Sequence, residues 1–232
     1  MEDQPEVSVS GLLGAGPWNS TAGERERACG WQAPWRLLRE PAWSWTGGTA
    51  VAAGQSEGDS FVRQAEQLGL GHAVLCAERV VGDEPFAVLL ADDFITYRGN
   101  GVTADLARAF QVSGKTQLSV MEVIGPDICK YGVVVPGGEP KSVAGLIEKP
   151  ELGKAPSNYA SIGRYVLTPD IFNILRALPA GTGGEIQLAD AINTQARNNA
   201  VEAVMLNGDR FDCGSVQGYL KAVMHIGAHK GK

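Results

Sequence analysis

Two adjacent carboxylates that follow a short apolar run are the first residues in this chain with a chemical use. Residues 86–91 carry no charge, and Asp92 and Asp93 come directly after them. An unbroken apolar run of this length predicts a strand buried on both faces of a sheet. Carboxylates at the carboxyl end of such a strand lie where open α/β sheets bind ligands, so Asp92 or Asp93 could hold Mg²⁺ on a phosphate substrate. An Asx turn at the end of the strand explains the same two residues equally well.

A third aspartate, Asp212, has a similar setting near the end of the chain. It follows Phe211, which we expect in a short strand, and it precedes a helix expected to begin at Gly214. Two aspartates from different strands could share one Mg²⁺ ion, because Mg²⁺ takes oxygen ligands and keeps several waters. The competing interpretation makes Asp212 the N-cap of the last helix.

The charged pair Glu148 and Lys149 follows another expected strand, and Pro150 stops that strand directly after them. A carboxylate at this place can accept hydrogen bonds from sugar hydroxyls, and a lysine can face phosphates as a point charge. The alternative is an exposed ion pair at a strand end, which is the stronger interpretation of these residues taken alone.

A loop with two glycines, at residues 69–74, follows Gln64 in the sequence. Glycine lets the backbone approach a ligand closely because no Cβ intervenes. The loop leads into an expected helix, where an anion or a flat base could bind. The glutamine amide can both donate to and accept from one edge of a base. A tight turn is the alternative, and a Gly-x-Gly pair is more often a turn than a nucleotide site.

The elements that must position these residues are regular from residue 61 onward. The apolar spacing predicts helices over 72–79, 102–113, 170–178, 185–197 and 214–225. It predicts strands over 86–91, 117–124, 131–135, 142–147, 160–167 and 201–206. Thr168 is the expected N-cap of the third helix, with Pro169 in its first turn. Strands that alternate with helices predict the α/β class, with a mostly parallel sheet covered by helices on both faces.

Residues 1–60 differ from the rest of the chain. All five tryptophans lie there, whereas the first lysine is Lys115, and no apolar period of 2 or 3.6 is sustained. We therefore divide the chain into an atypical segment, 1–60, and a domain, 61–232. Disorder is one interpretation of the first segment. Translation from a shifted reading frame is the other, and we favour it because tryptophan this dense is unusual for a disordered tail.

The net charge, the length of the apolar runs and the placement of the cysteines exclude several classes of partner and location. The net charge is −6 with no basic run, so we expect no nucleic acid partner. No apolar run approaches the roughly 20 residues of a membrane helix, and the acidic start lacks the layout of a signal peptide. The four cysteines are dispersed and read as reduced thiols, which favours a cytoplasmic location without a zinc site. The oligomeric state, including a homo-oligomer, stays open.

Seven segments together resemble a known family. In chain order they are QAEQLGLGHAV, FAVLLADD, YGVV, LIEKP, APSNYASIGRYVL, GGEIQLADAI and FDCGSVQGY. Their order and spacing resemble those of the bacterial UTP–glucose-1-phosphate uridylyltransferases, which are sugar nucleotidyltransferases, over residues 61–225. The resemblance implies a Rossmann-like nucleotidyltransferase fold with a mixed sheet. It implies the substrates UTP and glucose 1-phosphate, the products UDP-glucose and pyrophosphate, and the cofactor Mg²⁺.

The resemblance also implies roles for single residues. Gln64 and Gly69 would contact the uracil, Asp92 and Asp212 would bind the metal, and Lys149 would contact the phosphates. Lys149 and Asp92 would therefore be the catalytic residues. The residues expected to hold the glucose are Gly132, Glu148 and Gly163.

One part of the family pattern is missing from the sequence. The family begins with a strand and a loop of the type GxGTRxLPxTK around the triphosphate, and residues 1–60 hold no match to it. The glycine-rich residues 11–16 are not followed by Thr-Arg. We therefore expect a fold incomplete at the N-terminus, and keep a second function open: a non-catalytic UDP-sugar-binding or regulatory fragment. Use of dTTP is a third hypothesis, against which Gln64 and the 69–74 loop argue.

Overall fold

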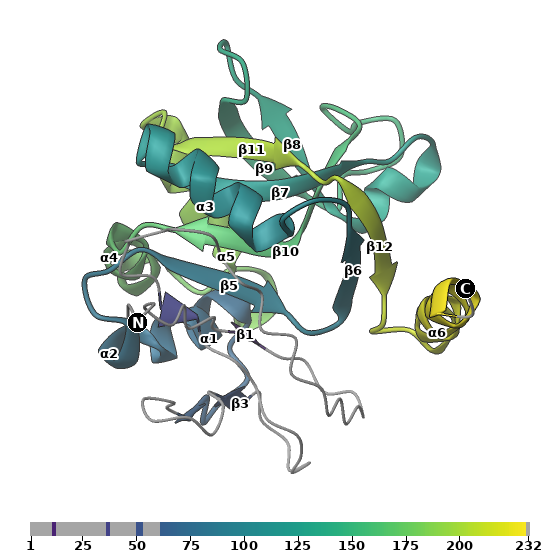
Figure 1. Ribbon diagram of the computed structural model, residues 1–232. Coiled ribbons are helices and arrows are strands. Elements are labelled where there is room, and N and C mark those ends of the chain that lie inside the picture. The colour runs from purple at the N-terminus through teal and green to yellow at the C-terminus, as the bar shows by residue number, and fades with distance from the viewer. Residues whose placement is uncertain (1–10, 13–35, 38–49, 53–60, 231–232) are drawn as a thin grey trace, which may run out of the picture.

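The computed structural model describes residues 11–12, 36–37, 50–52 and 61–230, which form a sheet with helices packed against it (Figure 1). The strands of the main sheet are β1 (Gly11–Leu12), β2 (Arg36–Leu37), β3 (Ala50–Ala52), β4 (Val62–Arg63), β5 (Phe86–Leu90), β7 (Thr116–Glu122), β8 (Gly132–Pro136), β9 (Val143–Glu148), β10 (Tyr159–Leu167) and β11 (Val201–Met205). Two further strands, β6 (Asp93–Tyr97) and β12 (Gly208–Asp212), pair with each other in a small second sheet. The helices are α1 (Leu70–Cys76), α2 (Glu78–Val81), α3 (Val102–Ser113), α4 (Asp170–Ala177), α5 (Leu188–Arg197) and α6 (Val216–Lys230), with two 3₁₀ turns, η1 (Pro126–Lys130) and η2 (Thr182–Gly184).

The main sheet is mixed, as the resemblance implies, and runs in the order β11-β7-β10-β5-β1-β3-β4. Its central strand β10 is antiparallel to both neighbours, β5 and β7, while β11 is parallel to β7. Among the described strands antiparallel pairings outnumber parallel ones, so the expectation of a mostly parallel sheet needs correction. The reason is that the chain returns through the β8–β9 hairpin and then enters β10 without a crossover helix, which parallel pairing would require.

Helices cover both faces of this sheet, as predicted. On one face α3 packs through Leu106 against Val166 of β10. On the other face α1, α4 and α5 enclose a larger core that includes the next residue, Leu167. Neighbouring side chains of a strand point to opposite faces, so β10 contributes to both cores. Within the larger core the rings of Phe86 and Phe172 stack with their centroids 5.0 Å apart.

Most predicted elements are confirmed, with several differences. The helix predicted over 72–79 is two helices, α1 and α2, and the helix predicted over 214–225 spans Val216–Lys230. Helix α3 has the predicted bounds, but α5 begins at Leu188 rather than at 185 because residues 182–184 form a separate turn. Strand β6 was not predicted, and β12 was predicted only near Phe211, because neither has a sustained apolar run or a regular alternation of apolar and polar residues. The capping role expected for Thr168 is wrong: Pro169 precedes α4 without a side-chain cap, and the Thr168 hydroxyl accepts a hydrogen bond from Nε2 of Gln195, 2.8 Å away.

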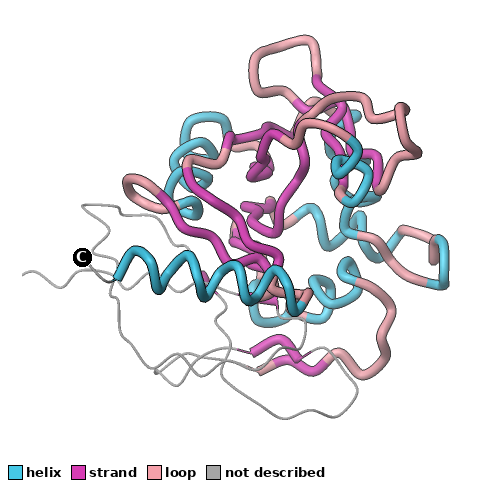
Figure 2. The backbone as a smooth tube through the Cα atoms, turned by 90° about the vertical axis from the view of Figure 1, so that its right-hand side faces the viewer, coloured by secondary structure: helices cyan, strands magenta, loops and turns pink. Residues whose placement is uncertain are grey.

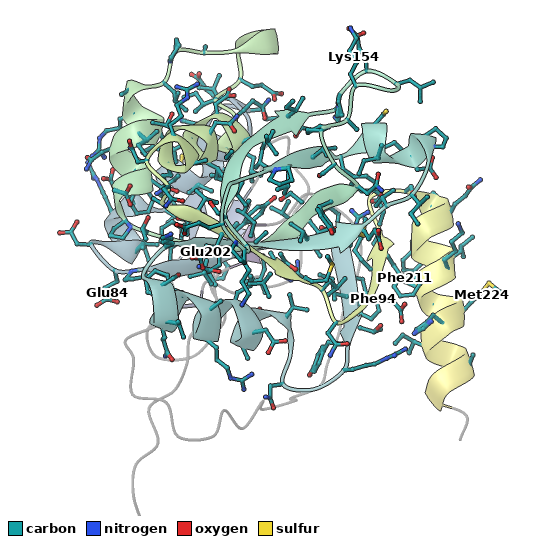
Figure 3. All side chains as sticks on the ribbon, turned by 90° about the horizontal axis from the view of Figure 1, so that it is seen from above. Glu84, Phe94, Lys154, Glu202, Phe211 and Met224 are labelled. Carbon is teal, nitrogen blue, oxygen red and sulfur yellow. The ribbon has the colours of Figure 1, made fainter. Side chains whose placement is uncertain are left out.

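Helix α6 lies to the side of the main sheet, next to β12 (Figures 1 and 2). The ring of Phe211 contacts two other rings (Figure 3). Its centroid lies 6.1 Å from that of Phe94 in β6 and 4.9 Å from that of His225 in α6. Met224 points away from the rest of the molecule. Within the described residues no helix has the length and apolar character needed to cross a membrane.

Candidate functional site

A cavity of about 390 Å³ opens between the end of β5, the strand β10, the β8–β9 hairpin and the start of α5. Residues from these separate parts of the sequence line it together. Six of the site residues suggested by the sequence are among its lining residues: Asp92, Asp93, Gly132, Glu148, Lys149 and Gly163. The fold therefore brings together the residues expected for the metal, the phosphates and the sugar.

Asp92 and Asp212 approach each other beside Gly214. A Cβ placed on Gly214 would lie 3.1 Å from Oδ1 of Asp212 and 3.4 Å from Oδ2 of Asp92. The backbone holds this arrangement, because the amide of Cys213 donates to the carbonyl of Asp92 at 2.7 Å. A residue larger than glycine at position 214 would crowd both carboxyl groups.

The N-cap interpretation of Asp212 is not needed, because Ser215 fills that role. Its hydroxyl accepts a hydrogen bond from the amide of Gly218, at 3.1 Å, at the start of α6. Asp212 instead accepts a bond from the Gly214 amide through Oδ1, at 3.1 Å, and its side chain stays exposed. The carboxylate therefore keeps acceptor capacity beside Asp92.

The electrostatics around Asp92 favour a cation. Burial raises the pKa of the Asp92 carboxyl, and the negative charges of Asp93 and Asp212 raise it further, although the Arg210 guanidinium lowers it. Among the described residues no cluster of three or more His, Cys, Asp or Glu side chains could hold a metal ion alone. A pair of carboxylates fits Mg²⁺, which often binds through one or two carboxylates, water and substrate phosphates.

Asp93, the second carboxylate of the pair, is buried beneath the site and not directed to solvent. Its Oδ2 accepts a hydrogen bond from the amide of Gly163 at 2.5 Å. Its Oδ1 accepts from Nε of Arg210, also at 2.5 Å, and forms an ion pair with the Nη2 group of the same guanidinium. Sequence reasoning missed Arg210, although it stands two residues before Asp212.

The guanidinium of Arg210 also reaches Tyr131. Its Nη1 donates to the Tyr131 hydroxyl at 3.2 Å, and its Cζ lies 5.3 Å from the centroid of the Tyr131 ring. Burial lowers the pKa of the Arg210 guanidinium. The charge and hydrogen bond of the Asp93 carboxylate act more strongly in the opposite direction, so the pKa is raised. Arg210 therefore remains a cation at the wall of the cavity.

Arg164 holds the turn that carries Asp92, and sequence reasoning missed this residue as well. Its Nη1 donates to the carbonyls of Leu90 and Gly163, both at 2.8 Å, and its Nη2 donates to the carbonyl of Asp93 at 2.7 Å. Burial lowers the pKa of the guanidinium, while Asp93 acts in the opposite direction. An arginine inside an apolar strand was the available signal.

Glu148 and Lys149 stand at the open side of the cavity. In the β8–β9 hairpin Glu148 pairs with Gly132, where an added Cβ would come within 2.9 Å of Oε2 of Glu148. Only glycine at position 132 leaves the carboxylate in this position. The amide of Lys149 donates to the carbonyl of Tyr131 at 3.0 Å, and its φ of 45° lies in the left-handed region, which is uncommon for a residue other than glycine.

Gln64 and Gly69 lie next to the cavity but do not line it. Gln64 is 1% exposed, and its Nε2 donates to the carbonyl of Gly69 at 3.1 Å and contacts Nδ1 of His72 at 2.9 Å. Leu70, the neighbour of Gly69, is a lining residue. The uracil contacts assigned to Gln64 and Gly69 therefore stay predictions.

The chain is similar to known proteins over most of its described length. The family model of the nucleotidyl transferases matches residues 50–229. A UTP–glucose-1-phosphate uridylyltransferase of Pseudomonas aeruginosa is 44% identical over 167 residues, which cover 70% of this chain and 60% of that protein. The chain thus spans less than two thirds of the length of this curated relative.

Solved structures match the same part of the chain. An apo UDP-glucose pyrophosphorylase is similar with a TM-score of 0.70 and 39% sequence identity, over 73% of this chain and 63% of that one. A UDP-glucose pyrophosphorylase complexed with UDP-glucose gives a TM-score of 0.68 and 39% identity, over 74% of this chain and 66% of that one. Because the family model covers most of the chain and the fold agrees with it, the chain belongs to the nucleotidyl transferase family.

Proposed function

We propose that this protein transfers the uridylyl group of UTP to glucose 1-phosphate and forms UDP-glucose and pyrophosphate. The observation that carries the proposal is the cavity that Asp92, Glu148 and Lys149 share, with Asp212 close to Asp92. The similarity to uridylyltransferases and to a pyrophosphorylase complexed with UDP-glucose supports this choice of substrates.

The sugar side of the proposal rests on the β8–β9 hairpin. The Glu148 carboxylate is exposed to the cavity and can accept hydrogen bonds from two sugar hydroxyls. A Cβ on Gly132 would displace the Glu148 carboxylate, and a Cβ on Gly163, which is buried, would displace Leu90 and Asp93, so both glycines shape this side of the cavity. In this proposal the hairpin and β10 fix the glucose so that its phosphate points toward Asp92.

The phosphate side requires positive charge, since two polyanions must approach each other. The phosphate oxygen of the sugar attacks the α-phosphorus in line with the departing pyrophosphate, so alignment and charge neutralisation are the main requirements. Asp92 and Asp212 would hold Mg²⁺, which when bound neutralises phosphate oxygens. Lys149 would offset the remaining charge on the sugar phosphate, and no covalent intermediate is needed.

The nucleotide side keeps the contacts implied by the resemblance. Gln64 holds the loop through Gly69 and His72, and Leu70 brings this loop to the cavity wall. We place the uracil there. A methyl group, by which thymine differs from uracil, is worth only about 1–3 kcal/mol in a pocket, so selectivity between UTP and dTTP depends on how closely the loop fits.

The three described cysteines are free thiols, which agrees with a cytoplasmic location.

Pyrophosphate release from UTP, glucose 1-phosphate and Mg²⁺ tests the proposal. We expect release by the full chain, and loss of about 10²-fold or more when Lys149 is changed to alanine, because a fixed charge on the transferred group is removed. Lys154→Ala is the matched control, since Lys154 lies on an exposed loop, where it pairs with the exposed Glu151 (Figure 3). Equal rates for the two variants would reject the role of Lys149.

A second measurement separates the proposal from the alternative of a non-catalytic protein. Calorimetry with UDP-glucose reports binding whether or not turnover occurs. Binding without pyrophosphate release would support the UDP-sugar-binding alternative. If the chain neither bound UDP-glucose at millimolar concentration nor released pyrophosphate, both functions would be rejected.

A further inference from the structure

We propose that Asp93 and Arg210 form a positioning pair, which sets the separation of the two carboxylates that bind the metal. The inference rests on the proposed function, because it assigns Asp92 and Asp212 to the metal. Neither Asp93 nor Arg210 is a catalytic residue in this proposal. Both act by placing their neighbours in the chain.

The register of the small sheet connects the pair to the two carboxylates. In the β6–β12 pairing Asp93 lies opposite Asp212, and Arg210 lies opposite Ile95. Arg210 and Asp212 are two residues apart and so share the face of the sheet on which Asp93 lies. Asp92 directly precedes Asp93. One ion pair therefore joins the residue next to the first metal carboxylate with the strand that carries the second.

The same pair connects the small sheet to the main sheet. Oδ2 of Asp93 accepts from the Gly163 amide of β10, and the Asp93 carbonyl accepts from Nη2 of Arg164. Asp212 lies at the end of β12, where the β6–β12 pairing and the Cys213–Asp92 backbone bond hold it beside Asp92. The Arg210–Asp93 ion pair adds a side-chain connection from β12 to the residue that bonds β10. Loss of this connection would leave the backbone bonds alone to fix the place of Asp212.

The energetics favour a positioning role over simple stabilisation. The side chains of Arg210 and Asp93 are only 11% and 4% exposed. Burial of a charge pair carries a desolvation cost that often cancels its attraction, and two apolar residues could hold the strands together equally well. An arginine that donates through Nε and Nη2 to one carboxylate adds directional constraint, which an apolar contact lacks.

Most donors of Arg210 are directed to the protein rather than to the cavity. Nε and Nη2 bond Asp93, and Nη1 bonds the Tyr131 hydroxyl. The guanidinium is thus fixed on both sides, which suits a residue that holds geometry. A residue that must follow a phosphate through the reaction would keep its donors available.

Binding of Mn²⁺ to the full chain, followed by electron paramagnetic resonance, tests the pair. Mn²⁺ serves as the spectroscopic probe for the Mg²⁺ site, and each titration is run without and with UDP-glucose. We expect Asp93→Asn to weaken Mn²⁺ binding by about 10-fold or more, the range found when residues that orient metal ligands are changed. Asparagine keeps an oxygen for the Gly163 amide but removes the charge that Arg210 requires.

Two further variants make the test specific. Arg210→Lys keeps the charge but has no planar fork, so it should weaken Mn²⁺ binding to an intermediate degree. The double variant Asp93→Asn with Arg210→Gln should bind Mn²⁺ no more weakly than Asp93→Asn alone, because coupled residues are not additive. Asp105→Asn is the matched control, since it breaks an exposed Asp–Arg pair on α3 and should leave Mn²⁺ binding unchanged.

The outcomes separate this inference from the proposed function. If Asp93→Asn lowers thermal stability but its folded fraction binds Mn²⁺ as the wild type does, the pair is only structural and the inference is overturned. If Asp93→Asn does not fold, Arg210→Lys decides in the same way. Weakened Mn²⁺ binding in a protein that never binds UDP-glucose would support the pair and reject the proposed function. A wild type that binds no Mn²⁺ even with UDP-glucose present would overturn the inference.

Discussion

The substitution Gly132→Ala, which adds one methyl group, tests whether Glu148 binds the sugar. A Cβ at this position would lie 2.9 Å from Oε2 of Glu148, so Gly132→Ala must displace the carboxylate. The displaced oxygen ends an exposed, flexible side chain, so the substitution should cost the folded protein little stability but remove a sugar contact. We expect the affinity for UDP-glucose, measured by calorimetry, to fall about tenfold while the protein stays folded. Gly138→Ala, at an open position of the same hairpin, should bind UDP-glucose normally. Equal affinities for both variants would remove Glu148 from the sugar site.

The raised pKa of Asp92 predicts that the stability of the protein depends on pH. Burial and the charges of Asp93 and Asp212 raise its pKa in the folded protein. The stability that Asp92 contributes is therefore fully present below the unfolded pKa of about 3.9, and is lost as pH rises through the higher folded pKa. In metal-free protein we expect Asp92→Asn to unfold at a higher temperature than the wild type near neutral pH, since asparagine removes the buried charge. The difference should shrink in acid. A lower melting temperature for Asp92→Asn at neutral pH would contradict this.

At the scale of elements, a buried polar network joins α5 to β7 and to the start of α4. Gln195 is 1% exposed; it donates to the hydroxyl of Thr168 and to Oδ2 of Asp170, and accepts from the hydroxyl of Thr116 at 2.9 Å. Gln195→Ala removes three side-chain bonds, while the hydroxyls of Thr116 and Thr168 keep their contact with each other. We therefore expect the free energy of unfolding, from urea denaturation, to fall by about 1–3 kcal/mol. Gln111→Ala on the exposed side of α3 should change it by less than about 0.5 kcal/mol. Similar values for both variants would contradict the role of the network.

Some elements could be predicted from the sequence and others could not, depending on whether a local pattern marks them. Helix α3 was predicted with its observed bounds because its apolar residues repeat with a helical period and Gly114 ends it in the left-handed conformation. The capping role of Thr168 could not be excluded, since only the folded structure brings Gln195 to its hydroxyl. Strands β6 and β12 pair across more than 100 residues of sequence, and such long-range pairing leaves no local pattern.

The same limit applies to the site. Glu148, Lys149 and Gly163 line the cavity as expected, because each follows or interrupts a strand with a clear apolar pattern. The contacts of Asp93 and Arg210 depend on a tertiary ion pair, and the buried place of Gln64 depends on how its loop packs. Residue type and spacing indicate which groups can do chemistry, but they do not indicate which of two adjacent aspartates is turned inward.

At the scale of the whole molecule, the cavity draws on segments from most of the domain, from Leu70 to Arg210 of the last described strand, and Asp212 lies at the end of that strand beside Asp92. A ligand that binds there should therefore stabilise the domain as a unit. At 100 times its dissociation constant, UDP-glucose with Mg²⁺ would contribute about 2.7 kcal/mol, which for a domain of this size raises the melting temperature by about 5–10 °C. We expect a chelator to remove part of this shift.

The part of the rise in melting temperature that depends on Mg²⁺ should require Asp212. In Asp212→Asn, UDP-glucose should still raise the melting temperature, but added Mg²⁺ should contribute nothing further, because one of the two carboxylates is lost. Asp209→Asn is the matched control: Asp209 is exposed on the same strand and pairs in register with Thr96, away from the cavity. Its melting curves should follow the wild type at each Mg²⁺ concentration. A full Mg²⁺ response in Asp212→Asn would mean that the ion binds elsewhere, and the two-aspartate site would have to be abandoned.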